Sequence, residues 1–272
     1  MIQLLNICNS FNRGVKYFIL TLLFSTFCYS SQNINSFIEQ SKLYENPYWS
    51  KLLHYRNGES EIDSDNFFIS KDGKTDLKKE LFETINSLKN GKNSVLCRFP
   101  LRVEWLKKNI PNLEKEIVVY PCPKLNEYLN AVDAKYVTLV FPTAHINSPA
   151  SMYGHTFLRV SSSEDTPLVS NAINFAAKTD DTNGLIFAYK GLFGEYEGRY
   201  SILPYYEKIK EYNNLEQRDI WEYDLNLTQE EIDRLVLHSF ELKDVYSDYF
   251  FFKENCSYNI LWLLEVARDD LD

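Results

Sequence analysis

The stretch GHTFLRVSSSEDTPLVSNAINFAA, residues 154–177, reads as two β-strands joined by a polar turn. In the first strand, His155 and Phe157 point to one side and the residues between them to the other. Asn174 lies in the middle of the second strand. Just upstream, KYVTLVF (135–141) is rich in β-branched and aromatic residues, which favours a further strand. The second half of the chain is therefore predicted to contain a β-sheet.

Segments with helical patterns come before and after these predicted strands in the sequence. Thr228 begins a capping box, Thr-Gln-Glu-Glu, in front of the amphipathic segment 230–243. A last helix is expected to begin near Asn255. Far upstream, apolar residues recur at helical spacing through 77–90. Strands and helices that occupy different parts of the chain predict an α+β fold.

We expect three parts along the chain. Residues 1–30 form a leader, residues 31–130 a mainly helical part, and residues 131–272 the core. Within the core stretch 183–215, residues 185–206 contain two bends centred on glycines and read as further strands or a long excursion. Their aromatic residues and glycines fit either a substrate-side lid or an irregular sheet.

The first thirty residues are predicted to be a secretory signal peptide. Arg13 and Lys16 precede about twelve mostly apolar residues, and the step Cys-Tyr-Ser follows at 28–30. A membrane-spanning helix needs about 20 apolar residues. An uncleaved anchor and a lipoprotein attached at Cys28 are the alternatives, but Phe27 is a poor fit to the small residue that a lipoprotein site requires. We therefore expect export to the periplasm or the cell envelope.

The composition disfavours nucleic acid as a partner. The chain of 272 residues has a formal net charge of −9, and the leader carries two positive charges and no negative one, so the mature charge is −9 − 2 = −11. No basic patch or interleaved run of cationic and aromatic residues occurs, which makes nucleic acid a poor candidate partner. The aromatic content of 15% fits either a protein with apolar ligands or a core rich in tyrosine.

Export changes how the five cysteines are interpreted. Cys8 and Cys28 lie in or at the leader. In an oxidising compartment Cys97 and Cys122 can form a disulfide that closes a loop of about 25 residues and contributes roughly 3 kcal/mol. Cys256 is then left over, and an odd cysteine in an exported protein is a candidate reactive thiol. The alternatives are that it pairs with another cysteine or is a buried structural residue.

Cys256 lies in FFKENCSYNILWLLE (251–265), where Asn255 is a natural N-cap for the helix that follows. At a helix start the dipole and the unpaired backbone N–H groups favour a thiolate and can donate to an oxyanion. A nucleophile also needs a base, and that base needs an orienting partner. His155 follows a glycine at the start of a strand and is the candidate base, with Asn174 on the next strand as the group that fixes its tautomer.

Other residues compete for these roles. His54 and His238 lie in helical patterns and read as surface or packing residues, and His145 lies in a loop. Asn171 falls on the opposite face of its strand from Asn174. Nothing in the sequence selects Arg159 or Glu195, although both residue types could orient a histidine.

The order of a strand with His155, a strand with Asn174 and a helix that starts at Asn-Cys resembles a circularly permuted papain-like fold. NlpC-type peptidases and the lecithin:retinol acyltransferase group share that fold. Several blocks between residues 47 and 265 further resemble the Lnb N-terminal periplasmic domain family. They are PYWSKLLHY, CRFPLRVEWL, SPASMYGHTFLRV, NAINFAA, KGLFGEYEGRYSILPYYEKIKEY, RDIWEYDLNLT and YFFFKENCSYNILWLLE.

The resemblance implies an envelope cysteine acyltransferase that acts on lipoproteins. Its acyl donor would be a phospholipid at the membrane surface, and its acceptor the N-terminal amine of a lipoprotein. Cys256 would be the nucleophile, His155 the base and Asn174 the orienting residue. Cys97 and Cys122 correspond to the paired cysteines of the family. No cofactor and no metal are implied.

Three residues are candidates for the oxyanion site or its support: Asn255, Ser151 and Tyr153. The chain stops sixteen residues after Cys256, whereas full Lnb-type acyltransferases continue into a membrane-spanning part. We therefore expect either a fragment or a stand-alone relative. The alternative functions are an NlpC-type cell-wall peptidase or amidase, a lipid hydrolase, and an envelope-binding module without catalysis. An apolar groove lined by aromatic residues beside Cys256 would favour lipid, and a narrow polar cleft would favour peptide.

Overall fold

The computed structural model divides the chain into two compact units, Met1–Ser41 and Lys42–Asp272. It describes residues 34–143, 155–163, 169–179, 181, 183–210 and 219–271. In the first unit α2 (Ile34–Ser41) lies within the described residues, and the predicted leader lies outside them. All that follows concerns the second unit. The predicted boundary near residue 130 stays a prediction.

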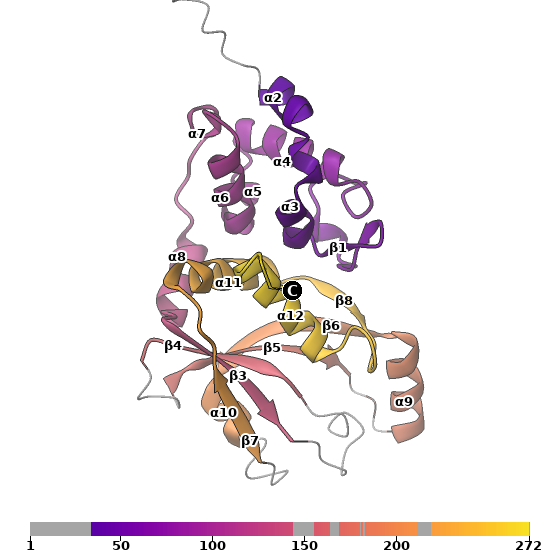
Figure 1. Cartoon of the computed structure of the whole chain (residues 1–272). Coiled ribbons are helices and arrows are strands. Elements are labelled where there is room, and N and C mark those ends of the chain that lie inside the picture. Colours follow the sequence, from indigo (N-terminus) through magenta and orange to yellow (C-terminus); the bar gives the residue numbers. More distant parts are fainter. Residues whose placement is uncertain are drawn as a thin grey trace, which may run out of the picture. The chain divides into compact units, whose positions relative to one another are not determined.

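A six-stranded antiparallel sheet forms the centre of the second unit. Its strand order is β7-β3-β4-β5-β6-β8 (Figure 1). The strands are β3 (Tyr136–Pro142), β4 (Phe157–Ser161), β5 (Asn171–Lys178), β6 (Tyr196–Pro204), β7 (Ile220–Asp224) and β8 (Tyr246–Tyr249). The predicted pairing of the two strands in 154–177 is confirmed, with Phe157 opposite Asn174. His155 lies just before the first of these strands rather than inside it.

Helices precede, separate and follow the strands of the sheet along the chain. They are α8 (Pro123–Val132), α9 (Gly184–Phe193), α10 (Tyr205–Lys210), α11 (Gln229–Glu241) and α12 (Cys256–Ala267). The capping box at Thr228 is present: its side chain accepts from the Glu231 N–H, and the Glu231 carboxylate accepts from the Thr228 N–H. Figure 1 shows α11 and α12 over one side of the sheet, where α12 packs on β4 and β5.

The expectation of further strands is wrong for the first part of residues 183–215. Residues 184–193 form the helix α9, which Asn183 caps and which ends at Gly194 with φ of 75°. The segment GLIFAYKGLF is apolar on nearly every side, so it has no periodicity that separates a helix from a buried strand. β6 and α10 follow it.

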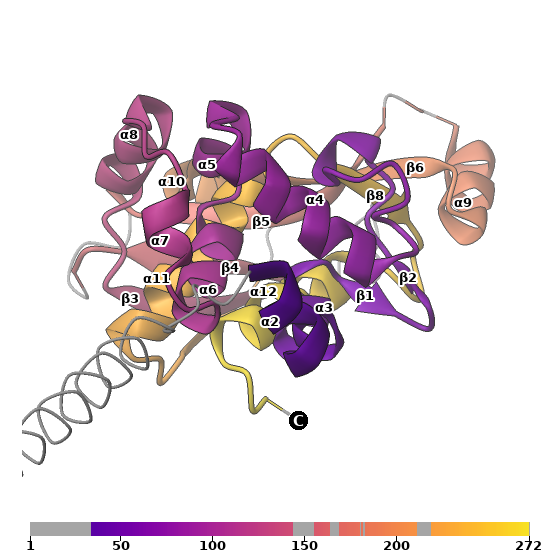
Figure 2. The ribbon, with the colours of Figure 1, turned by 90° about the horizontal axis from the view of Figure 1, so that it is seen from above.

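The upstream part is mainly helical, as predicted. Its helices are η1 (Leu43–Glu45), α3 (Pro47–Leu52), η2 (Asp65–Phe67), α4 (Leu77–Lys89), α5 (Asn93–Arg98), α6 (Pro100–Asn109) and α7 (Leu113–Glu116), with a hairpin of β1 (Tyr55–Arg56) and β2 (Glu59–Ser60). In α4, Leu81, Ile85 and Leu88 are all buried. Seen from above in Figure 2, α6 lies over α11 and α3 over α12, and each of these pairs is in contact.

Hydrogen bonds join this helical part to α12. The Tyr48 hydroxyl donates to the Val266 carbonyl at 2.7 Å. The Glu61 carboxylate accepts from the Tyr258 hydroxyl at 2.6 Å and from the Trp262 indole at 2.7 Å. Because α12 begins at Cys256, the upstream part helps to hold the helix that carries this cysteine.

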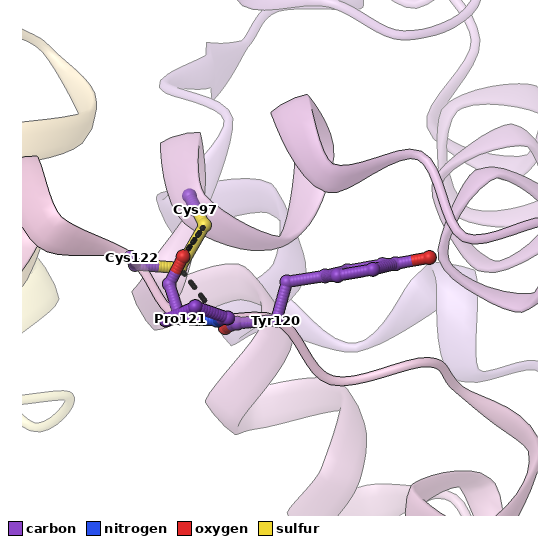
Figure 3. The surroundings of a disulfide bond; sticks show 4 residues. All are labelled: Cys97, Tyr120, Pro121 and Cys122. Atoms are coloured by element: carbon purple, nitrogen blue, oxygen red, sulfur yellow. Dashed lines mark hydrogen bonds between the residues drawn. A yellow bond between two sulfur atoms is a disulfide. The ribbon is translucent and has the colours of Figure 1, made fainter.

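The predicted disulfide is confirmed (Figure 3). It joins Cys97 in α5 to Cys122 just before α8, with the two Cα atoms 5.3 Å apart. The crosslink closes 25 residues of chain, which stabilises the fold by roughly 3 kcal/mol. Of the described helices, none has both the length and the apolar character needed to cross a membrane.

Candidate active site

Cys256 is the first residue of α12, and the local sequence explains why the helix begins there. Asn255 has an extended backbone, and its side-chain oxygen accepts from the Tyr258 N–H at 3.2 Å. Its amide nitrogen donates to the Phe251 carbonyl at 3.0 Å, which fixes the chain on the other side of the cap. The Asn255 side chain therefore caps the helix with its oxygen and holds the preceding segment with its nitrogen. The Cys256 side chain is buried, with a relative exposure of 5%.

The surroundings of the sulfur favour a thiolate. Burial raises the pKa of Cys256, but hydrogen bonds from the His155 side chain, the Thr156 N–H and the Tyr249 hydroxyl, together with the charge of His155, lower it to about 7. That value lies well below the ordinary range of a thiol. A substantial fraction of Cys256 is therefore ionised at neutral pH.

His155 contacts the sulfur and is itself held by Asn174. Its Nε2 atom forms a short hydrogen bond with the Asn174 side-chain oxygen. An amide oxygen only accepts, so Nε2 carries a proton and Nδ1 is the ring nitrogen that can take the thiol proton. Asn174 is buried in β5, and its amide nitrogen donates to Ser201 of β6 at 3.4 Å. Three elements distant in sequence thus bring together Cys256, His155 and Asn174.

A second contact fixes the start of β4 against the start of α12. The Thr156 and Ser257 hydroxyls are hydrogen-bonded at 2.7 Å. Because Thr156 follows His155 and Ser257 follows Cys256, this bond holds the two segments in register beside the reactive pair. Neither hydroxyl was singled out from the sequence.

Tyr249 is a site residue that the sequence analysis missed. Its hydroxyl donates to the Cys256 sulfur and accepts from the Cys256 N–H. Burial, and then the neighbouring Cys256, raises the pKa of Tyr249 well above its ordinary value, so the hydroxyl stays protonated. One of 19 tyrosines, it carries no local signal of a role, because its position depends on the pairing of β8 with β6.

The other candidates lie elsewhere or cannot be placed. Ser151, Tyr153 and His145 lie outside the described residues. Asn171 donates to the Ala131 carbonyl at 3.2 Å. Arg159 bonds to Thr138 and Glu222, each at 3.0 Å, and Glu195 is exposed. Across the described parts of the chain, no cluster of three or more His, Cys, Asp or Glu side chains could hold a metal ion.

The arrangement contains the parts that acyl transfer requires. It has an ionisable thiol, a histidine in contact with it and an amide that sets the tautomer of the histidine. A protonated tyrosine hydroxyl lies beside the sulfur, where it can donate to an oxyanion. No cofactor is needed for such a reaction.

Two family models match the chain. One, described as the Lnb N-terminal periplasmic domain, matches residues 124–272 and so spans more than half of the chain. The other, described as a domain of unknown function (DUF7843), matches residues 41–109. No curated protein and no solved structure matches. The first match confirms the family resemblance and supports a periplasmic location. It covers five of the seven sequence blocks, and the other two, PYWSKLLHY and CRFPLRVEWL, lie in the second match.

Proposed function

Since the chain belongs to the Lnb N-terminal periplasmic domain family, we propose that it is a cysteine-dependent acyltransferase of the cell envelope. It moves an acyl chain from a phospholipid, through a thioester on Cys256, to the N-terminal amine of a lipoprotein. The observation that carries this proposal is the contact between Cys256 and His155, with Asn174 behind the histidine. Residues that serve only in packing do not need a thiol, a histidine and an amide in hydrogen-bonded sequence.

In the first half-reaction, His155 takes the thiol proton and the Cys256 sulfur attacks the ester carbonyl of the phospholipid. The Tyr249 hydroxyl, which no longer faces a charged sulfur, donates to the oxyanion that forms. As the C–O bond breaks, the His155 imidazolium protonates the oxygen of the departing lysophospholipid. The acyl chain is then bound to the sulfur as a thioester.

In the second half-reaction, the amine of the acceptor attacks the thioester. His155 removes a proton from the attacking nitrogen, the C–S bond breaks, and an amide and a Cys256 thiolate result. Asn174 keeps the imidazole in one tautomer through both halves. Because the first product leaves before the second substrate reacts, the kinetics are expected to be ping-pong.

We also propose that the core is a permuted papain-like fold. The strand that follows His155, the strand that holds Asn174 and the helix that begins with Cys256 occur in this order along the chain. An antiparallel sheet packs on that helix, as such an enzyme requires.

An aromatic cluster beside the site makes its surroundings apolar on one side, which is the environment that a lipid donor would need. Phe187, Tyr196 and Phe251 form a buried cluster, with Tyr249 packed against it. Tyr249 therefore contacts apolar side chains with its ring and the Cys256 sulfur with its hydroxyl. An acyl chain that leads away from the sulfur along this side would meet aromatic carbon.

The proposal is tested by intact-mass analysis after the protein is mixed with phospholipid in detergent. We expect an adduct of acyl mass on Cys256, released by hydroxylamine, that then moves to an added diacylglyceryl-cysteine peptide. Cys256→Ala should give no adduct, and His155→Ala should slow its formation by at least about 100-fold. Circular dichroism checks that both variants remain folded.

Each competing function gives a different result in this assay. An adduct that yields only free fatty acid, whatever amine is added, would identify a lipid hydrolase. Cleavage of cell-wall peptides with no reaction on phospholipid would identify a peptidase. Absence of both reactions in a folded protein with an alkylatable Cys256 would leave an envelope-binding module and overturn the proposal.

A further inference from the structure

Gly198 lies inside β6, and the backbone does not explain why a glycine is needed there. Among the described glycines, positive φ occurs at Gly58, Gly91 and Gly194, but not at Gly198. A glycine inside a strand weakens that strand, and it often marks a place where another group approaches the backbone closely. The reason for this glycine is therefore to be found in the space above it.

Two aromatic rings occupy that space. A Cβ atom on Gly198 would lie 2.3 Å from the Phe175 ring and 3.1 Å from the Tyr249 ring. Non-bonded carbon atoms pack best at about 3.5–4.0 Å, so a side chain at this position would have to move a ring. Because β6 lies between β5 and β8 in the sheet, Phe175 and Tyr249 reach over it from the two sides (Figure 1).

Tyr249 is the ring that would give way. Phe175 is fully buried, and its ring packs on that of Tyr200 with centroids 4.8 Å apart. The Tyr200 hydroxyl donates to the Asn259 carbonyl of α12 at 2.8 Å, which holds Tyr200 in place. Tyr249 is only partly buried, and its ring stacks on Phe175 at 5.8 Å with 19° between the ring planes. A displaced Phe175 would therefore push Tyr249.

The position of the Tyr249 ring matters because of its hydroxyl, which donates to the Cys256 sulfur. The same ring meets Phe251 edge to face, with centroids 6.1 Å apart. Its contacts with Phe175 and Phe251 together fix where the hydroxyl lies. Hydrogen bonds weaken steeply once their geometry is lost, so a small shift of this ring is enough to remove the donor.

We propose that Gly198 is a positioning residue of the candidate active site. Because it has no side chain, the Phe175 ring lies over β6 and holds the Tyr249 hydroxyl against the Cys256 sulfur. A larger residue at this position displaces Tyr249 and removes one donor from the thiolate. The consequence for oxyanion stabilisation rests on the proposed function, whereas the effect on the thiol does not.

The test is the pH dependence of Cys256 alkylation in the full chain without substrate, followed by mass on the peptide that contains Cys256. We expect Gly198→Ala to raise the alkylation midpoint by about one unit, as the loss of one hydrogen bond to the thiolate would. Since the pKa of Cys256 is about 7, alkylation at pH 7 should become about fivefold slower.

Double variants show whether the effect passes through the two rings. With Tyr249→Phe in place, Gly198→Ala should add no further shift of the midpoint, because the hydroxyl that it displaces is gone. With Phe175→Leu in place, Gly198→Ala should cause no shift, because the methyl group fits where the ring was. Gly198→Val in the same Phe175→Leu background fills that space again and should raise the midpoint. This last variant serves as the test if Gly198→Ala alone does not fold.

Gly73→Ala is the matched control, because an aromatic ring over a strand glycine can also stabilise a sheet by packing alone. A Cβ atom on Gly73 would lie 2.3 Å from the Glu80 carboxylate and 2.8 Å from the Phe68 Cβ, in the upstream helical part. This change should lower the free energy of unfolding and leave the alkylation midpoint in place.

Four results would overturn the proposal. They are an unchanged midpoint in folded Gly198→Ala, an equal shift in Gly73→Ala, a further shift when Gly198→Ala is added to Tyr249→Phe, and an unchanged midpoint when Gly198→Val is added to Phe175→Leu. The third result would mean that Gly198 acts on the thiol by a route other than Tyr249.

This proposal and the proposed function can fail separately. A raised midpoint in Gly198→Ala, with no acyl adduct on Cys256 of the unaltered protein, would retain the role of Gly198 and reject acyl transfer. An adduct formed from phospholipid, with the midpoint unchanged in Gly198→Ala, would retain acyl transfer and reject the role of Gly198.

Discussion

At the scale of single residues, the reactivity of Cys256 is set by opposing effects. Burial raises the pKa of the thiol, and donors from the start of β4 and the end of β8 lower it to about 7. Tyr249→Phe removes one donor but keeps the ring, which stacks on Phe175 at 5.8 Å. We expect the pKa of Cys256 to rise by about one unit, because one hydrogen bond to the thiolate is worth about 1–2 kcal/mol. The pH dependence of alkylation by a small reagent measures this.

Tyr200→Phe is the matched control for that experiment. Tyr200 is buried nearby, but its hydroxyl donates to the Asn259 carbonyl at 2.8 Å. Its loss should leave the alkylation midpoint in place. If Tyr249→Phe also left the midpoint in place, the assignment of Tyr249 as a donor to the sulfur would be wrong.

At the scale of secondary-structure elements, two caps of similar strength have different consequences. Asn255→Ala removes the cap of α12, and Thr228→Ala removes the cap of α11. Each should lower the free energy of unfolding by about 1 kcal/mol in urea denaturation. Only Asn255→Ala should also raise the pKa of Cys256, because the frayed first turn no longer holds the sulfur near His155. An equal shift of the Cys256 pKa in Asn255→Ala and Thr228→Ala would contradict this.

Elements with local signals could be predicted from the sequence. The capping box at Thr228, the cap at Asn255 and the strand around Phe157 depend on residues close together in the sequence. All three are present in the structure, although every residue of β4 is buried. α9 was missed although Asn183 and Gly194 bracket it as caps. Its apolar composition on both faces hid the helical period.

For the candidate site, the sequence allowed three residues and their order along the chain to be predicted, but not the full set of contacts. His155, Asn174 and Cys256 could be selected because each lies at a recognisable strand or helix start or on a strand face. Tyr249 could not, because its approach to the sulfur depends on the long-range pairing of β8 with β6. A tertiary contact of this kind leaves no mark on neighbouring residues.

At the scale of the whole molecule, a buried polar network joins the upstream helices to α11. His54 and His238 are hydrogen-bonded through their Nε2 atoms at 2.9 Å, and His238 Nδ1 donates to Glu241 at 2.8 Å. Glu241 also accepts from the N–H groups of Leu101 and Arg102, at 2.8 and 3.0 Å. All of these polar groups are buried, so the upstream helices and α11 are expected to unfold together.

The network makes the fold sensitive to acid, and the sign follows from the direction of each pKa shift. Burial lowers the pKa of His238 to about 3 and that of His54 well below its ordinary value. Below about pH 6.5 these two histidines therefore bind protons in the unfolded chain but not in the folded chain. The free energy of unfolding falls as the pH falls. Burial raises the pKa of Glu241 to about 7, which opposes this trend between about pH 4.5 and 7. Below about pH 4.5 Glu241 no longer opposes the loss of stability that the two histidines cause.

His54→Asn removes one of the two histidines, and asparagine tolerates the left-handed backbone there, where φ is 50°. We expect the slope of unfolding free energy against pH, measured in urea between about pH 4 and 6, to become shallower by about 1.4 kcal/mol per pH unit. Leu53→Ala, a neighbouring fully buried change without a titrating group, should lower the whole curve and keep its slope. An unchanged slope in His54→Asn would mean that His54 is protonated in the folded protein, and that the network tolerates a charge that its burial should exclude.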